Sequence, residues 1–298
     1  MRILHLSDFH LGQVEGPNAD GIDPRESLRR MLADCAHIEG IDLVVISGDI
    51  ADDGAPASYE AAAGMVAAFA RSRGAPQIYC VGNHDHRPAF AEVLGSGHVA
   101  VDGRDGGTLV DSAELERAAV SDAAGHRVVT LDALVPGKGY GWLSDTQLDW
   151  LADVLATPAE RGTTLVLHYP PIALDLPVER ALMLQNAAAL RSAIERSDVR
   201  MVLCGHFHHQ MVGRLGQTPV VVTPGVLGRI DLTTAKGTER GVVGASATVV
   251  ELDGPHAPIS YVLHARDPQV GRTAYELSAE ELATEIAELG PPGPSGSA

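Results

Sequence analysis

Apolar runs and amphipathic segments alternate through the first third of the chain. Residues 2–6, 42–46 and 76–80 are short, mostly apolar runs that end within two residues of a Gly or Asp, which is typical of buried strands. Between them, apolar residues recur at helical spacing after Pro24 and Pro56, which predicts two amphipathic helices. Strands that alternate with helices favour a parallel sheet with right-handed crossovers.

The same alternation resumes in the middle of the chain. Strands are predicted at residues 127–131, 163–167 and 199–204, and residues 186–196 form a helix between the last two. Capping-box patterns, in which a Ser is followed three residues later by Gln or Glu, begin further helices after Ser144 and after Ser278.

The stretch at residues 95–126 lacks this regularity. Gly is frequent and periodicity is poor, so we expect a loop with one short helix at residues 113–119. Loops of this length in compact domains are often lids or binding loops. His98 is therefore a candidate substrate contact.

The C-terminal part has a different pattern of predicted elements. Residues 219–223, 245–252 and 259–264 read as strands without helices between them, which suggests antiparallel pairing and a second sheet. Residues 290–298 are rich in Pro, Gly and Ser and are predicted to be disordered. Since neither a linker nor an internal repeat is evident, we expect one domain at residues 1–289.

The amino-acid composition limits the kinds of binding partner that are expected. The 298 residues include 22 Lys and Arg against 39 Asp and Glu, a net charge of −17, which disfavours a nucleic-acid polymer as partner. A small anion stays compatible if metal ions supply positive charge. Three scattered cysteines without a CxxC pair favour a reducing compartment, so the cytoplasm is expected. No stretch approaches the ~20 apolar residues that span a membrane.

Five predicted strands end in residues that bind metals. Carboxyl ends of parallel strands lie along one edge of a sheet, so these side chains can converge. A single His or Gly-Asp is more often an ordinary polar residue or a turn, but five such strand ends together indicate a site. Seven ligands are too many for one tetrahedral ion and suit two ions that share a carboxylate. The candidate ligands are Asp8, His10, Asp49, Asn83, His168, His206 and His208.

These motifs resemble a known family. Asp8-x-His10, Gly48-Asp49, Gly82-Asn83-His84-Asp85, His168 and Gly205-His206-x-His208 match, in order, the calcineurin-like metallophosphoesterases, over roughly residues 1–252. The resemblance implies an α/β fold, a four-layer α/β-β/α sandwich of two mixed sheets. It also implies two metal ions (Fe, Mn or Zn) and attack on phosphorus by a hydroxide that the metals activate.

The resemblance also assigns each candidate a role. Asp8, His10, Asp49 and His208 would bind one metal, and Asp49, Asn83, His168 and His206 would bind the other. His84 would contact the phosphate together with Asn83 and protonate the leaving oxygen, and Asp52 would orient His84. A carboxylate that fixes an imidazole and raises its pKa is a sound physical role. Asp85 more often supports the loop than acts on substrate.

One segment narrows the choice within the family. Residues 131–151 resemble the class III cyclic-nucleotide phosphodiesterases and their glycerophosphodiesterase relatives, although Tyr169 stands where the family commonly has a second His. The resemblance implies hydrolysis of small phosphodiesters, with 3',5'-cyclic nucleotides as the first expectation. The alternatives are a glycerophosphodiesterase, a broad phosphomonoesterase, a DNA exonuclease (which residues 1–12 also resemble) and a non-catalytic metal-binding scaffold.

Two further polar residues lie near the motifs in sequence. His209 follows the last ligand and can reach the rim of the site as a substrate contact. Asn186 opens a helix, where an N-cap role is favoured over a substrate contact. Homodimers are common in the resembled subfamily, although no feature of this sequence demonstrates one.

Overall fold

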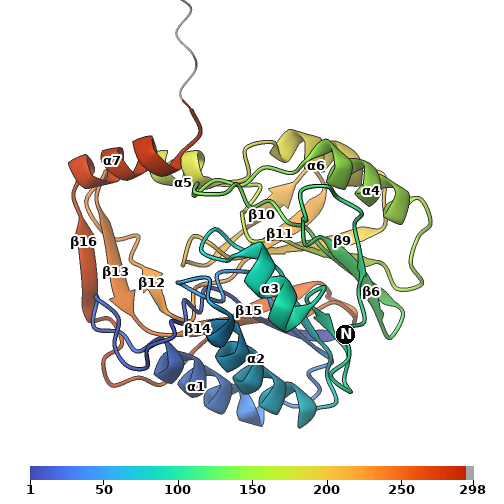
Figure 1. The fold of residues 1–298 in the computed structure, drawn as a ribbon, viewed down its shortest axis with the longest axis horizontal. Coiled ribbons are helices and arrows are strands. Elements are labelled where there is room, and N and C mark those ends of the chain that lie inside the picture. The colour runs from blue at the N-terminus through green and yellow to red at the C-terminus, as the bar shows by residue number, and fades with distance from the viewer. Residues whose placement is uncertain (293–298) are drawn as a thin grey trace, which may run out of the picture.

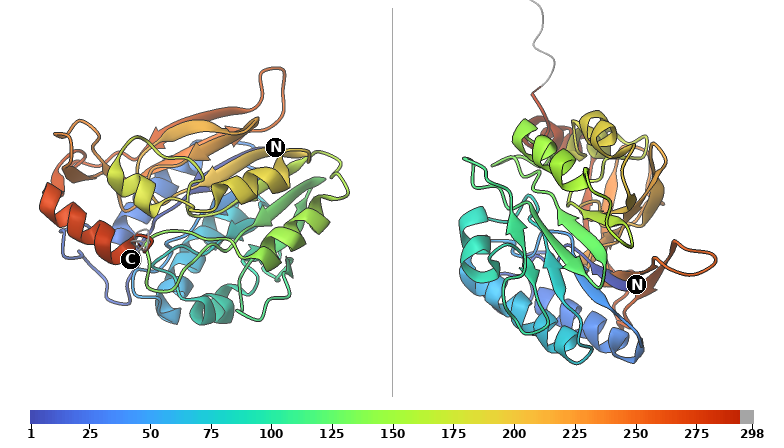
Figure 2. Two further views of the ribbon diagram at one scale, coloured as in Figure 1. Left: turned by 90° about the horizontal axis from the view of Figure 1, so that it is seen from above. Right: turned by 90° about the vertical axis from the view of Figure 1, so that its right-hand side faces the viewer.

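The protein, described here from a computed structural model over residues 1–292, consists of two mixed β-sheets that pack face to face (Figures 1 and 2). Helices cover the outer faces of both sheets, so the order of layers is helix, sheet, sheet, helix. This confirms the predicted four-layer α/β arrangement.

The first sheet has the strand order β15-β14-β1-β2-β3-β4. Its centre is parallel, as predicted. β14 and β4 pair with it in antiparallel orientation, and β15 pairs antiparallel with β14. The strands are β1 (Arg2–Leu6), β2 (Leu43–Ile46), β3 (Gln77–Tyr79), β4 (His98–Val99), β14 (Ser246–Glu251) and β15 (Ile259–His264). The helical segments of this half are α1 (Pro24–Asp34), η1 (Cys35–His37), α2 (Pro56–Arg71) and α3 (Arg87–Leu94).

The second sheet has the order β10-β11-β9-β8-β7-β6-β5, and its four central strands, β11, β9, β8 and β7, run parallel. Its strands are β5 (Thr108–Leu109), β6 (Ala119–Ala123), β7 (His126–Thr130), β8 (Thr163–Val166), β9 (Val199–Cys204), β10 (Met211–Leu215) and β11 (Thr218–Val222). Its helices are α4 (Asp145–Leu155) and α6 (Ala187–Ile194).

A third, three-stranded sheet with the order β12-β13-β16 stands beside the sandwich (Figure 1). It consists of β12 (Gly228–Ile230), β13 (Glu239–Val243) and β16 (Thr273–Leu277). Next to it, α5 (Pro177–Leu182) packs against α7 (Ala279–Leu289). The sequence patterns did not reveal this sheet.

Aliphatic residues explain why the two sheets stack. Ile3, Val45, Val166 and Leu203 belong to one buried cluster that draws on strands of both sheets. Residues on the opposite faces of the same strands, such as Leu4, pack with the helices. Because both faces of the central strands are buried, their sequences are continuously apolar instead of alternating.

Of the two predicted capping boxes, the one at Ser278 forms completely and the one at Ser144 forms in part, and Asp23 caps α1 in addition. Asp23 accepts a hydrogen bond from Glu26 N, and Ser278 with Glu281 makes a complete capping box at α7. At α4, Ser144 accepts from Gln147 N, but the Gln147 side chain turns instead to Asp132 and Glu116.

The expectation for residues 95–126 was partly wrong, because most of residues 100–118 is loop as predicted but short strands replace the helix. No helix forms at residues 113–119. The segment contributes β4, β5 and β6, and β6 pairs with β7 in an antiparallel hairpin through the turn at Ala124 and Gly125. Periodicity is poor because these strands are short and partly exposed at the sheet edges. The stretch therefore adds edge strands to both sheets, β4 to the first and β5 to the second.

The C-terminal strands also differ from expectation. β14 and β15 are antiparallel, as predicted, but they extend the first sheet beside β1, whereas β11 lies parallel to β9 in the second sheet. Hydrophobic patterning reports which residues are buried and not which sheet a strand joins, so sheet membership was not readable. Residues 293–298 of the predicted disordered tail lie outside the described residues.

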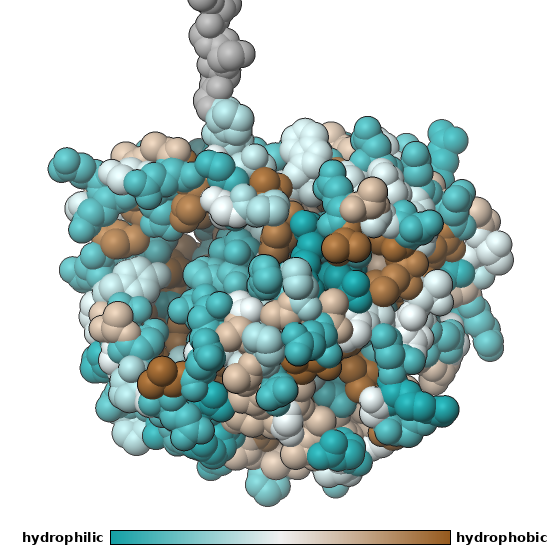
Figure 3. Space-filling view, viewed as in Figure 1, coloured by the Kyte–Doolittle hydropathy of each residue, from teal (hydrophilic) through white to brown (hydrophobic). Residues whose placement is uncertain are grey.

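The surface shows no dominant apolar area on the face in Figure 3, where hydrophilic and hydrophobic residues are interspersed. Within residues 1–292, every helix is too short or too polar to cross a lipid bilayer.

A buried ion pair joins the two halves of the sandwich. Arg87, the first residue of α3, donates through Nε and Nη2 to the two carboxylate oxygens of Asp132, at 2.7 and 2.8 Å. The side chains are 13% and 1% exposed. Because loss of Arg87 would leave a buried carboxylate without its cation, we predict that Arg87→Met lowers the free energy of unfolding by about 3–5 kcal/mol.

Urea unfolding of the metal-free protein measures this effect. Arg266→Met is the matched control, because Arg266 forms its ion pair with Asp34 at the surface with 84% of its side chain exposed. The control is expected to change stability little. Equal losses in the two variants would contradict a special contribution from the buried pair.

Candidate metal centre

The predicted ligands gather at one edge of the sandwich, in the loops that follow β1, β2, β3, β8 and β9. Three groups bring their ligand atoms within 4.8 Å of one another. One contains Asp8, His10 and His208, a second contains Asp49, His168 and His206, and the third links His10 and Asp49 with His84. The strand ends therefore converge as the sequence predicts.

The backbone at these positions is unusual. Of the seven non-glycine residues with positive φ in residues 1–292, five are predicted ligands, with φ between 49° and 75°. A left-handed conformation costs a non-glycine residue roughly 1–2 kcal/mol. Such strain persists only where the surroundings over-determine it, and it concentrates at functional sites. The five residues are Asp8, His10, Asp49, His206 and His208.

The first cluster brings together nitrogen atoms that would otherwise repel. His10 places Nδ1 3.1 Å from an oxygen of Asp52, so its proton belongs on Nδ1 and Nε2 carries a lone pair. That Nε2 lies 3.2 Å from Nε2 of His208, which in turn lies 3.5 Å from Oδ1 of Asp8. A cation among these acceptors satisfies all of them, so the residues fit a metal ion.

The second cluster has the same character. Nδ1 of His168 donates to the carbonyl oxygen of Ser47 at 2.7 Å, which leaves Nε2 as the free acceptor. This Nε2 lies 3.2 Å from Asn83 Oδ1 and 3.2 Å from Asp49 Oδ2. His206 donates through Nε2 to a backbone carbonyl at 3.1 Å and thereby presents Nδ1 to the site.

Asp49 stands between the two clusters. Its Oδ2 is 3.2 Å from His168 Nε2 and 3.7 Å from His10 Nε2. Burial opposes the charge of Asp49. In the metal-free protein, however, the imidazoles of His168 and His84, when protonated, hold the pKa of its carboxyl well below the usual range. An ionised, buried carboxylate that touches both clusters is suited to bridge two cations.

Two motif glycines permit this close approach. A Cβ at Gly82 would lie 2.2 Å from Oδ1 of Asp49, and one at Gly205 would lie 1.9 Å from Oγ of Ser7. Any side chain at either position would push the ligand loops apart.

His84 lies beside the two ligand clusters and belongs to neither of them, in agreement with the prediction that it is not a metal ligand. Its Nδ1 is 3.0 Å from Oδ1 of Asp52, its side chain is 42% exposed, and its backbone N–H donates to Asp49. Burial of the ring disfavours its charge, but the charge of Asp49 and the hydrogen bond to Asp52 outweigh this and raise the pKa of His84 to about 9. The same Asp52 oxygen also meets His10, and these two hydrogen bonds lower the pKa of Asp52.

Asp85 braces the site, as expected. Its carboxylate accepts hydrogen bonds from the backbone N–H groups of Ile50, Ala51 and Gly82, at 3.1, 3.1 and 2.8 Å. It thereby ties the loop after β2 to the loop after β3.

His98 does not face the site, which corrects the expectation that it contacts substrate. Its side chain is 1% exposed in β4. Both ring nitrogens are satisfied, Nδ1 by Ser121 at 2.6 Å and Nε2 by Thr130 at 3.0 Å. It is a core histidine with internal partners.

His209 and Asn186 also differ from expectation. His209 is 5% exposed and its Nε2 lies 2.8 Å from Glu179 on α5, so it does not line an open rim. Asn186 occupies the N-cap position of α6 without a side-chain capping bond, because its amide pairs with both backbone groups of Leu143.

Sequence reasoning missed the groups that hold the ligands in place. The carbonyls of Ser47 and Leu182, which fix the His168 and His206 rings, are backbone atoms and leave no trace in the side-chain pattern. Tyr169, where the resembled family commonly has a His, is fully buried with its ring 5.1 Å from both the His168 and His206 rings. The replacement of the family's usual His by Tyr169 was the one sign in the sequence that this position needed attention.

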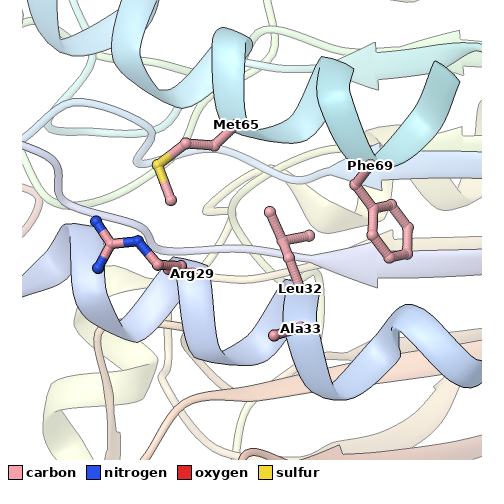
Figure 4. A pocket seen from close by; sticks show the side chains of 5 residues that line it. All are labelled: Arg29, Leu32, Ala33, Met65 and Phe69. Carbon is pink, nitrogen blue, oxygen red and sulfur yellow. The ribbon is translucent and has the colours of Figure 1, made fainter. Parts of the chain in front are cut away.

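The apolar hollow in Figure 4 is a separate feature. It has a volume of about 340 Å³ and lies between α1 and α2, on the outer helical layer away from the ligand loops. Its lining is Arg29, Leu32, Ala33, Met65 and Phe69, which offers no set of metal-binding groups.

The chain is similar to known proteins over most of its length. Residues 1–210 match the family model described as calcineurin-like phosphoesterase. A cAMP/cGMP dual specificity phosphodiesterase of Mycobacterium tuberculosis is 36% identical over 245 residues, which covers 82% of this chain and 73% of that protein. A 3',5'-cyclic adenosine monophosphate phosphodiesterase of Escherichia coli is 31% identical over 213 residues, covering 71% and 70%.

Solved structures support the same fold. A dimetal phosphatase from Danio rerio superposes with a TM-score of 0.56 at 16% identity, covering 84% of this chain and 95% of that one. At this identity the likeness concerns the fold alone.

We predict that Asp49→Ala greatly reduces the binding of both metals, because its carboxylate borders both ligand clusters. Elemental analysis after reconstitution with Mn²⁺ is expected to give about two ions per chain in the parent protein and fewer than about one in the variant. Asp53→Ala is the control, because that nearby carboxylate bonds with Gln13, Ala55 and Ser58 and not with a predicted ligand. A variant that still binds both ions would remove the bridging assignment.

Proposed function

The chain belongs to the calcineurin-like phosphoesterase family, and on that premise we propose that it hydrolyses small phosphodiesters at a two-metal centre. One observation carries the proposal. Two clusters of metal-binding atoms lie on either side of Asp49, and His84 stands next to them with its Nδ1 held by Asp52. Phosphoryl transfer needs this combination of concentrated positive charge and a proton donor.

Two ions would be held by the residues already described. Asp8, His10, Asp49 and His208 would hold one, and Asp49, Asn83, His168 and His206 the other. When bound, such ions polarise phosphoryl oxygens and acidify water. Carboxylate, imidazole and amide donors suit Fe, Mn and Zn, and the choice among these metals stays open.

His84 is the proposed general acid and substrate contact. With Nδ1 held by Asp52, its Nε2 is the nitrogen left to meet a substrate, and its partial exposure allows access. It would donate its proton to the leaving oxygen, while Asn83 would contact the phosphate group next to it. Nearby cations would lower the pKa of His84 from about 9 towards neutral pH, where a general acid works best.

Asp52 is the proposed orienting residue. One of its oxygens meets Nδ1 of both His10 and His84, so it fixes a candidate ligand and the candidate acid at once. Both rings then present Nε2, one towards the metal cluster and one towards substrate.

Cyclic nucleotides are the proposed substrates, because the M. tuberculosis and E. coli relatives carry that activity in their names. A glycerophosphodiester or a phosphomonoester is the alternative. The net charge of −17 argues against a nucleic-acid polymer as substrate.

A non-catalytic scaffold is disfavoured, because a metal-binding residue type is present at every predicted ligand position. A cytoplasmic location stays a prediction based on the three cysteines, all free and buried.

We predict that His84→Ala loses turnover according to the leaving group. Hydrolysis of cyclic AMP, which releases a poor alkoxide, is expected to fall by about 10²–10⁴-fold, the usual contribution of a general acid. Hydrolysis of bis(4-nitrophenyl) phosphate should fall much less, since its phenolate leaves without a proton. Metal content should be unchanged. Equal losses on the two substrates would contradict the general-acid role.

The substrate class is tested by parallel assays with Mn²⁺ on cyclic AMP, cyclic GMP, a glycerophosphodiester and a nucleoside monophosphate. We expect the highest kcat/KM for a cyclic nucleotide. The highest value for the glycerophosphodiester would move the proposal to that class of diester. The highest value for the monoester would reject a phosphodiesterase.

A further inference from the structure

One short helix is attached directly to the loop that carries His206. Residues 169–186 connect the end of β8 to the start of α6, and α5 lies in the middle of this excursion from the second sheet. The base of the excursion is fastened by Leu184 N, which donates to Pro170 O at 3.0 Å. The tip has no strand to hold it, so its position depends on contacts made by α5 itself.

Two histidines of the 205–209 loop contact α5. His206 donates through Nε2 to the carbonyl oxygen of Leu182 at 3.1 Å. His209 places Nε2 2.8 Å from Oε1 of Glu179. The other oxygen of Glu179 accepts from Leu174 N at 2.7 Å. Both carboxylate oxygens therefore have a partner, one in the 205–209 loop and the other in the excursion itself.

The His209–Glu179 contact is buried. The two side chains are each about 5% exposed. The His209 ring also stacks on Phe207, with the ring planes 15° apart. A hydrogen bond to a buried carboxylate is stronger than one between neutral groups, and removal of the donor leaves the carboxylate without compensation. This pair is therefore the main polar fastening of α5 to the ligand loop.

We propose that His209 is a positioning residue that clamps α5 onto the 205–209 loop through Glu179. A helix of six residues is too short to be stable alone, so the position of α5 depends on its contacts with the rest of the protein. Besides the His209–Glu179 pair, these are the packing of α5 against α7 and the hydrogen bond from His206 to the Leu182 carbonyl. While α5 is seated, the Leu182 carbonyl holds the proton of His206 on Nε2 and leaves Nδ1 for a metal. The clamp itself stands on the contacts alone, and its link to the metal rests on the proposed function.

Limited proteolysis tests the clamp without any assay of activity. Arg180 lies within α5 with 65% of its side chain exposed, and it is the one Lys or Arg between residues 169 and 190. Trypsin can cut after Arg180 only when α5 unfolds locally. We expect His209→Leu to accelerate this cut by about 10-fold or more, producing fragments 1–180 and 181–298 that mass spectrometry identifies.

Two control variants separate the clamp from general damage. His209→Gln keeps an N–H donor near the position of Nε2 and is expected to be cut nearly as slowly as the parent protein. His126→Leu removes another buried imidazole, which lies 3.3 Å from Asp253. Because His126 contacts neither α5 nor the ligand loop, its loss should leave the cut after Arg180 unchanged. Faster cutting of this variant to the same degree would overturn the clamp.

A double-mutant cycle tests the pairing. Glu179→Gln alone should also speed the cut, because His209 and Leu174 N use different oxygens of Glu179 and Gln replaces one of these acceptors with an NH₂ donor. If the two side chains act as one contact, the double variant is cut no faster than the faster single variant. Fully additive effects, or an unchanged rate in His209→Leu, would overturn the proposal.

The link to His206 has its own readout. Mn²⁺ titration of the parent and His209→Leu proteins is expected to show about 10-fold weaker binding of one ion in the variant, as is typical when a group that orients a ligand is lost. Faster cutting with unchanged Mn²⁺ affinity would overturn the link to the metal. A protein that hydrolyses no phosphodiester at all would refute the proposed function and leave the proteolysis result intact, so the two failures are distinguishable.

Discussion

The structure depends on one arrangement, the convergence of acceptor atoms from both sheets around the buried carboxylate of Asp49. Imidazole nitrogens and carboxylate oxygens face each other there at 3.2–3.7 Å, which is tolerable only with cations or protons between them. Five predicted ligands reach the centre through left-handed backbone that non-glycine residues rarely adopt. The backbone strain and the close contacts between acceptor atoms are concentrated at this edge of the sandwich. The aliphatic core between the two sheets provides the rigidity that maintains them.

Around this centre, each reactive ring is fixed from behind. Ser47 O holds His168, Leu182 O holds His206, and Asp52 holds His10 and His84 together. These partners decide which nitrogen of each ring faces inward, so they determine chemistry without touching a substrate. The fixing groups come from the loop after β2 and from α5, so the site depends on more than its ligand motifs.

Much of this was readable from sequence because apolar runs and caps are local. β1, α1 and the convergence of strand ends followed from spacing, and Asp85 was correctly assigned to loop support. Sheet membership of β11 and β14 was not readable, since burial does not encode pairing partners. His98 and His209 were misjudged for a related reason. Sequence shows a polar residue near a motif, but only the fold shows that Thr130 and Glu179 already satisfy it.

The bridging position proposed for Asp49 requires two adjacent cation sites. Crystals grown with Mn²⁺ should show them by anomalous diffraction. We expect two peaks per chain roughly 3.5–4 Å apart, one beside His10 and His208 and the other beside Asn83 and His168, with Asp49 bound to both. A single peak, or two peaks without Asp49 between them, would refute the bridging position.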